Sequence, residues 1–233
     1  MLYFNFDYLL FMLPAIIITL VVQIKLKATY SRFSRVKNSR GLTGAQAAQE
    51  TLRNAGVYGV RIEQTSGNLT DHFSPKENVI RLSKDVYNGT TIAAVGIACH
   101  EAGHAIQYDR EYAPIKLRNT LIPVTNIGSK IGLLLIIIGL ILSNTYYYSE
   151  TIFFVGIVLY SLVVVVQLVT LPVEFNASRR AMESIRGSGM LSDEECSGAR
   201  KVLTAAALTY VAAMISSLMT VLYYISLANR RRD

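Results

Sequence analysis

The sequence has few cysteines, few histidines and few charged residues for its length of 233 residues. Cys99 and Cys196 are the only cysteines, so the chain has no disulfide framework. Charged residues make up 17% of the chain and hydrophobic residues 52%, and long runs carry no charge at all. This composition indicates a membrane protein rather than a soluble enzyme.

Acidic residues are missing from a stretch that is rich in cations. No acidic residue appears between the first apolar run and Glu50, whereas six cations do: Lys25, Lys27, Arg32, Arg35, Lys37 and Arg40. The positive-inside rule places such cations on the cytoplasmic side, in contact with lipid headgroups. The net charge of +7 therefore indicates a lipid bilayer as partner. Because no aromatic residues interleave with the cations in an RNA-binding pattern, we expect no nucleic-acid partner.

The first 24 residues lack the basic start and the small-residue cleavage site of a signal peptide. Asp7 is their only charge, and a membrane helix tolerates Pro14 with a kink. Residues 1–24 are therefore predicted to form an uncleaved transmembrane anchor.

Two further apolar runs, at residues 131–143 and 152–171, predict a transmembrane hairpin that occupies residues 121–171. The connection between them has no Lys or Arg and contains Tyr146, Tyr147 and Tyr148, which suits an outer loop at an aromatic belt. The chain after the hairpin is expected on the same side of the membrane as the chain before it.

The C-terminal segment, residues 202–233, is apolar and then ends in three arginines at 230–232. If the segment crosses the membrane, these arginines lie outside, against the positive-inside rule. Either the rule fails here or the segment does not cross. We expect a fourth span that begins near Leu208.

Residues 25–120 are predicted to form a cytoplasmic catalytic region. Thr43 and Gln46 have the spacing of a capping box, which predicts a helix over residues 45–54. Apolar and polar side chains alternate over residues 57–64, as in a half-buried strand, and residues 78–83 are a second strand candidate. This second strand is expected either as an edge strand that pairs with an extended substrate or as an ordinary buried strand.

Two of the three histidines, His100 and His104, are four residues apart in a helical pattern that begins near Thr90 or Thr91. This spacing puts both imidazoles on one face of a helix, with Glu101 beside them, as in the H-E-x-x-H motif of zinc proteases. Neutral imidazoles bind Zn²⁺, and the carboxylate accepts a proton from the water that attacks a carbonyl. Cys99 is expected to be a small buried residue on the far side of the helix.

A third ligand is expected on the segment at 172–201, because the hairpin returns this segment to the side of His100 and His104. Glu174 follows the hairpin directly, and two histidines with one glutamate form a known catalytic zinc set. Spacing alone leaves competitors open, which are Glu183 and the acidic run at 193–195. The acidic run resembles a helix start, with Ser192 as the cap and Glu195 at the third following position.

With these residues placed, the chain resembles the YugP-like membrane zinc metallopeptidases, also called neutral zinc metallopeptidases. The matching segments cover essentially the whole chain and are residues 41–44, 69–75, 81–83, 92–107, 171–181 and 202–211. More distantly, the plan resembles HtpX-like proteases and CAAX prenyl endopeptidases. This resemblance implies that Glu174 is the third ligand. It also implies that Ser178, where that motif has an aspartate, contacts a ligand histidine without adding charge.

We therefore expect an α-helical integral membrane protein of about four transmembrane helices with a small α+β zincin-like (gluzincin) catalytic region. The expected function is a membrane-embedded zinc endopeptidase with one Zn²⁺, located in the plasma membrane of a bacterial cell with its site facing the cytoplasm. Its partners are the bilayer and a protein or peptide substrate. An oxyanion needs a stabilising group, for which the candidates are His72, Arg179 and Tyr210.

Two other functional classes, a scaffold and a transporter, agree less well with the sequence. A non-catalytic, zinc-stabilised scaffold would need a closed site with four ligands, which Cys99 cannot easily complete because it points about 100° around the helix from His100. A transporter would need paired broken helices and charges within the membrane, and only Lys130 lies in an apolar span.

Overall fold

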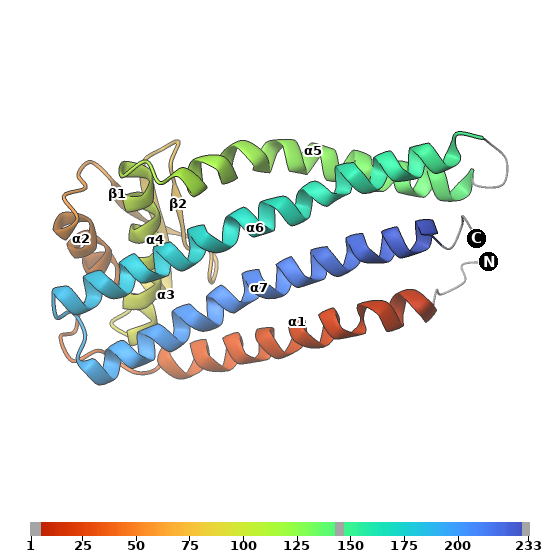
Figure 1. Cartoon of the computed structure of the whole chain (residues 1–233). Helices are drawn as coiled ribbons and strands as arrows, with labels where there is room; N and C mark the ends of the chain where they lie inside the picture. Colours follow the sequence, from red (N-terminus) through yellow and green to blue (C-terminus); the bar gives the residue numbers. More distant parts are fainter. Residues whose placement is uncertain (1–5, 143–146, 230–233) are drawn as a thin grey trace. The chain divides into compact units, whose positions relative to one another are not determined.

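The computed structural model describes residues 6–142 and 147–229 and is mostly helical. Its elements in chain order, all but β3 labelled in Figure 1, are α1 (Phe6–Phe33), α2 (Gly44–Asn54), β1 (Arg61–Thr65), β2 (His72–Ser74), β3 (Val79–Ser83), α3 (Lys84–Tyr87), α4 (Ile92–Asp109), α5 (Ala113–Ile141), α6 (Ser149–Gly187) and α7 (Asp193–Asn229). Tyr146 of the expected tyrosine loop and the arginines at 230–232 lie outside the described residues. The expected combination of long helices with one small sheet is confirmed.

Within the part of the chain that the structure describes, four helices are long and apolar enough to cross a membrane, namely Tyr8–Phe33 of α1 and the whole of α5, α6 and α7. Large apolar side chains are exposed along them, among them Ile24 at 68%, Ile127 at 65% and Val158 at 66%. Water would penalise this exposure, whereas a bilayer would not. The number of predicted spans is therefore confirmed by length and composition. The helix of the fourth span is longer than predicted, since α7 begins at Asp193 rather than near Leu208.

The chain divides into two compact units. The membrane-helix unit comprises Met1–Val21, Leu117–Leu171 and Tyr210–Asp233, and the sheet unit comprises Val22–Lys116 and Pro172–Thr209. The four long helices contribute residues to both units.

Glycines bring α5 and α6 close together in the membrane-helix unit. A Cβ placed at Gly156 would lie 2.7 Å from the Ile136 backbone nitrogen and 2.8 Å from the Gly132 carbonyl oxygen. A Cβ at Gly132 would lie equally close to α6, at 2.7 Å from the Gly156 carbonyl oxygen. Small residues at facing positions let membrane helices pack backbone to backbone. The predicted hairpin is thus held by a glycine contact that no hydropathy pattern indicates.

The sheet unit contains a three-stranded sheet in the order β1-β3-β2, with β1 parallel and β2 antiparallel to β3. The strand predicted at residues 78–83 is present as β3, and of the two alternatives left open for it the buried strand is confirmed and the edge strand is excluded. It is central, and four of its five residues are buried. The reason is β2, a three-residue strand that pairs through His72–Arg81 and Ser74–Val79 and covers the second side of β3. So short a strand leaves no alternating pattern in the sequence.

The predicted helix cap is confirmed, whereas the predicted start of the first strand is not. The capping box is present, since the Gln46 N–H donates to Thr43 Oγ1 and the Thr43 N–H donates to Gln46 Oε1. The first strand begins at Arg61 instead of residue 57, because Gly59 has a φ of +80° that interrupts the extended backbone.

We predict that Gly156→Ala lowers the stability of the chain by about 1–3 kcal/mol, because the added methyl group forces α5 and α6 apart. Gly187→Ala is the matched control on the same helix, since a Cβ there meets nothing within 4 Å. It should leave the midpoint of thermal unfolding in detergent unchanged or slightly higher. Equal midpoints for the two variants would contradict the close helix contact.

Candidate metal centre

The motif helix α4 is buried on nearly all sides in the sheet unit. Its N-terminus is capped by Thr91, whose Oγ1 accepts from the Ala94 N–H at 3.2 Å. The helix contacts α2, α3, β2 and β3. It also meets α6 closely, since a Cβ at Gly103 would lie 2.6 Å from the Ala177 carbonyl oxygen. Gly103 therefore allows the backbone of α6 to approach the helix that carries the two histidines.

Three side chains converge where α4 meets α6. His100 and His104 lie one turn apart on α4, and Glu174 comes from α6. Glu174 Oε2 is 3.3 Å from His100 Nε2 and 3.6 Å from His104 Nε2. One donor atom from each of the three lies within 4.8 Å of the other two. The structure thus brings together the three residues that were expected to bind the metal.

The orientation of His104 is fixed by a buried glutamine. His104 Nδ1 is 3.0 Å from Gln107 Oε1, while Gln107 Nε2 donates to the Val173 carbonyl at 2.7 Å and to Asn176 Oδ1 at 3.0 Å. Because Gln107 Nε2 must face a carbonyl, its Oε1 must accept from His104. His104 therefore carries a proton on Nδ1, and its Nε2 faces Glu174.

His100 has a corresponding partner on α6. Its Nδ1 lies 3.1 Å from Ser178 Oγ, one turn after Glu174. Ser178 is thus in the contact that the family resemblance implied. Since its hydroxyl carries no charge, it orients the ring of His100 without adding the negative charge that an aspartate would bring.

The chemistry of the three donors suits zinc. Each histidine has its Nδ1 occupied, so two imidazole nitrogens and one carboxylate oxygen are directed to one point. Three protein ligands of this kind, with a further position open, are typical of catalytic Zn²⁺ sites. Burial opposes a charge on His104, yet the hydrogen bond that the protonated ring can donate to Glu174 and the charges of Glu101 and Glu174 raise the pKa of His104. The centre therefore favours positive charge, which a metal ion would bring.

Glu101 lies next to His100 on α4 and is buried, with 8% of its surface exposed. A carboxylate at this depth, close enough to raise the pKa of His104, lies near the point where the three donors meet. It can accept a proton there.

The other candidate residues lie elsewhere. His72 is exposed on β2, with its Nδ1 2.8 Å from the Thr70 carbonyl. Arg179 and Glu183 are exposed and face each other at 3.9 Å, so Glu183 is not directed to the histidines. Tyr210 belongs to the membrane-helix unit and stays a prediction.

The acidic run at the start of α7 has a capping role. Glu195 Oε2 accepts from the Ser192 N–H, and its N–H donates to Ser192 Oγ, which confirms the predicted capping box. Glu195 also accepts from the Ser39 N–H at 2.6 Å.

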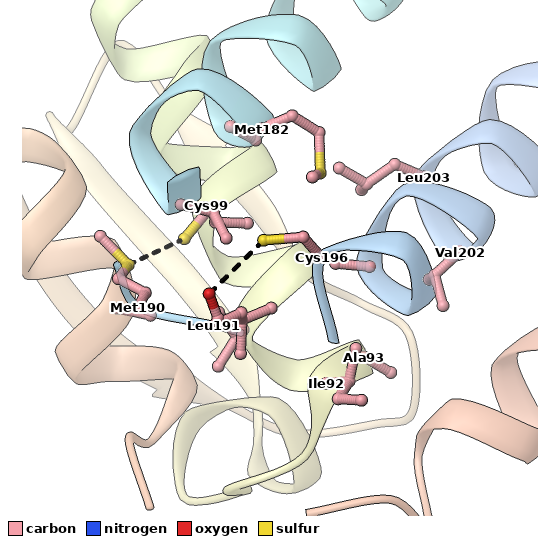
Figure 2. Close-up of a cluster of buried hydrophobic side chains, with 14 of the residues drawn as sticks. Ile92, Ala93, Cys99, Met182, Met190, Leu191, Cys196, Val202 and Leu203 are labelled. Atoms are coloured by element: carbon pink, nitrogen blue, oxygen red, sulfur yellow. Dashed lines mark hydrogen bonds between the residues drawn. The ribbon is translucent and has the colours of Figure 1, made fainter. Parts of the chain in front are cut away.

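Cys99 lies in the hydrophobic core, as predicted. Figure 2 shows it in a cluster with Met190, Leu191 and Cys196, and its Sγ lies 4.0 Å from Met190 Sδ. Thr51 Oγ1 donates to Cys99 Sγ at 3.2 Å. Burial raises the pKa of the Cys99 thiol to about 12. A thiol that stays protonated is a poor metal ligand, so Cys99 has a packing role.

Sequence reasoning missed Gln107 and Asn176. Arg180 Nε donates to Asn176 Oδ1 at 2.8 Å, so the amide that supports Gln107 is itself held in place. A signal was available for Gln107, since it lies three residues after His104 on the same helix face and a ligand histidine needs an acceptor for its second nitrogen.

The chain is similar to proteins that are described as metallopeptidases or proteases. A family model described as "Putative neutral zinc metallopeptidase" matches residues 8–229. A protein of Bacillus subtilis (strain 168), described as "Putative membrane protease YugP", is 42% identical over 211 residues, which cover 91% of this chain and 92% of that protein. No solved structure matches the chain. The match confirms the family resemblance, and its range contains all three converging residues.

We predict that Gly103→Ala weakens zinc binding at least tenfold, because the new methyl group displaces α6 and with it Glu174. Gly96→Ala, seven residues earlier on α4, is the control, since a Cβ there meets Ala199 at an ordinary 3.6 Å. Competition with a chromogenic chelator measures both affinities. If both variants bind zinc like the wild type, the approach of α6 does not set the site.

We predict that Gln107→Leu lowers zinc affinity about 10–100-fold, because His104 loses the acceptor that fixes its tautomer. The exposed Gln49 on α2 supplies the control Gln49→Leu, which should bind zinc normally. Thermal unfolding of the metal-free proteins separates a loss of affinity from a loss of fold. An unchanged affinity in folded Gln107→Leu would exclude the orienting role.

Proposed function

The chain belongs to the neutral zinc metallopeptidase family, and from this premise we propose that it is a membrane-embedded zinc endopeptidase. The observation that carries the proposal is the convergence of His100, His104 and Glu174 beside the buried Glu101. We assign the first three as ligands of one Zn²⁺ and Glu101 as the general base.

Each side chain at the site has a separate role in the proposed reaction. Zinc, when bound, supplies a Lewis acid that activates water and polarises a carbonyl. Glu101 accepts the proton of the attacking water and then donates it to the leaving amine. Gln107 and Ser178 keep the two imidazoles in the orientation that presents Nε2. The burial of Glu101 and Glu174 limits access of bulk water to the proton that Glu101 carries.

The proposed organisation keeps the predicted segments. Residues 1–24 anchor the chain, residues 25–120 and 172–201 form a small α+β zincin-like region, residues 121–171 form a hairpin, and residues 202–233 form the fourth span. With the six cations after the anchor on the cytoplasmic side, the zinc site faces the cytoplasm of a bacterial cell. The substrates that suit such a site are membrane proteins or peptides close to that surface.

The number of ligands favours a catalytic role for zinc over a structural one. Structural zinc sites are usually closed by four protein ligands, often with cysteine. Among the residues that the structure describes, three side chains of the ligand types converge, and Cys99 points into the core. A zinc ion held by these three ligands would keep a position for water and substrate.

We predict that Glu101→Gln abolishes proteolysis while it leaves zinc affinity within about threefold of the wild type. His104→Ala should lose both, because it removes a ligand. Glu183→Gln is the control and should retain activity, since this carboxylate is exposed and faces Arg179. Cleavage is measured by identifying the new protein termini that form in membranes containing each variant.

The two variants separate the possible failures. Full cleavage by Glu101→Gln would falsify the assignment of the base, even if zinc is bound. Normal zinc content in His104→Ala would place the metal elsewhere. The termini that appear with the wild type and not with Glu101→Gln identify the substrates.

A further inference from the structure

A cleft lies between α1 and α7 within the sheet unit, and no histidine is among the residues that line it. Its volume is about 540 Å³, and its lining comes from residues 25–33 of α1 and residues 200–205 of α7. Its polar lining consists of cations and hydroxyl groups, namely Lys25, Arg32, Arg200, Lys201, Thr29 and Thr204. No acidic side chain is among the described residues that line it. This set of side chains suits an anion.

The cleft lies at the level where both helices change from charged to apolar. On α1, Lys25 is the first cation after the apolar run. On α7, Lys201 is the last charge before an apolar stretch that continues to Ala228. Two independent helices therefore mark the same boundary, which is where a bilayer has its headgroups.

The walls of the cleft are held in place by close packing. A Cβ at Gly198 would lie 2.7 Å from Phe33 Cε1, so α7 and the end of α1 approach closely there. Phe33 is buried, and the Arg32 guanidinium carbon lies 5.4 Å from the centre of its ring. A binding site with fixed walls loses less entropy when it takes up a ligand.

The positive charge of the cleft is not balanced by the protein. Other cations have acidic partners, such as Arg40 with Glu50 and Arg179 with Glu183. None of the four cleft cations has an ion pair within residues 6–142 and 147–229. Four like charges around one cleft repel each other, and an anion relieves that repulsion.

We infer that this cleft binds the headgroup of an anionic phospholipid, with its phosphate between the cations of α1 and those of α7. A lipid suits the site better than free phosphate because apolar groups share the lining, including Ala28 and Ala205, and Ile24 on the membrane side of Lys25 is 68% exposed. The acyl chains lie along this apolar surface. The site is separate from the proposed zinc chemistry and does not depend on it.

The test uses the purified full-length chain in detergent with added dioleoyl phosphatidylglycerol, and counts bound lipid by native mass spectrometry. Lys25→Gln/Arg32→Gln removes one lysine and one arginine from the cleft. Lys27→Gln/Arg35→Gln removes the same two residue types, one on α1 and one two residues after its end, but outside the lining. The cleft variant should bind the lipid at least tenfold more weakly, and the control variant should stay within twofold of the wild type. Arg200→Gln repeats the test from α7.

Each outcome decides the inference. Equal weakening in the two double variants would show diffuse attraction to the basic surface and would overturn a built site. Equal binding of dioleoyl phosphatidylcholine by the wild type would overturn the anionic preference. Displacement of the lipid by glycerol phosphate at similar concentration would show that the acyl chains contribute nothing, and would overturn the choice of a lipid. Thermal unfolding of each variant verifies that it is folded.

Discussion

The close approach of α4 and α6 at Gly103 and Ala177 is the contact on which the metal centre depends. Both histidines lie on α4, whereas the Glu174 carboxylate lies on α6. The contacts that orient the two rings also reach α6, because His100 contacts Ser178 and Gln107, which contacts His104, donates to Val173 and Asn176. Without a glycine at this position, a methyl group would occupy the space of a backbone carbonyl. The donors converge because two backbones pack without a side chain between them.

The same principle recurs in the membrane-helix unit with other residues. There Gly132 and Gly156 let α5 and α6 pack backbone to backbone. In a bilayer the hydrophobic effect gives little drive for helices to associate, so such close contacts carry much of the packing energy. The hairpin that returns the chain to Glu174 and the site that uses Glu174 therefore rest on one kind of contact.

What the sequence predicted well was local or followed from composition. The predicted caps at Thr43 and Ser192 bind backbone groups a few residues away, and the spacing of His100 and His104 is a property of a single helix. The spans follow from long apolar runs. The role of Glu174 as a neighbour of both histidines required the topology of the hairpin, and the family resemblance supported it.

What the sequence did not predict depends on contacts between distant segments. The position of β3 in its sheet is set by β2, whose three residues carry no periodic signal, so the sequence left open whether β3 is an edge strand or a buried one. The spacing of Gln107 from His104 was a usable signal, but the contact of its amide with the Val173 carbonyl joins two distant segments and was visible only in the structure. The cleft between α1 and α7 combines cations that are about 170 positions apart, and here too the charge of each segment was visible while their meeting was not.

The sulfur-rich core has a practical consequence. Both cysteines of the chain are buried, at 0% exposure for Cys99 and 1% for Cys196, and they sit among methionine and aliphatic side chains (Figure 2). Maleimide and nitroxide reagents require an accessible thiolate, which neither residue offers in the folded chain. The native protein is therefore already a background for single-cysteine labelling. A thiol introduced in any loop would be the one that reacts, with no need to disturb the packing around α4 by removing Cys99.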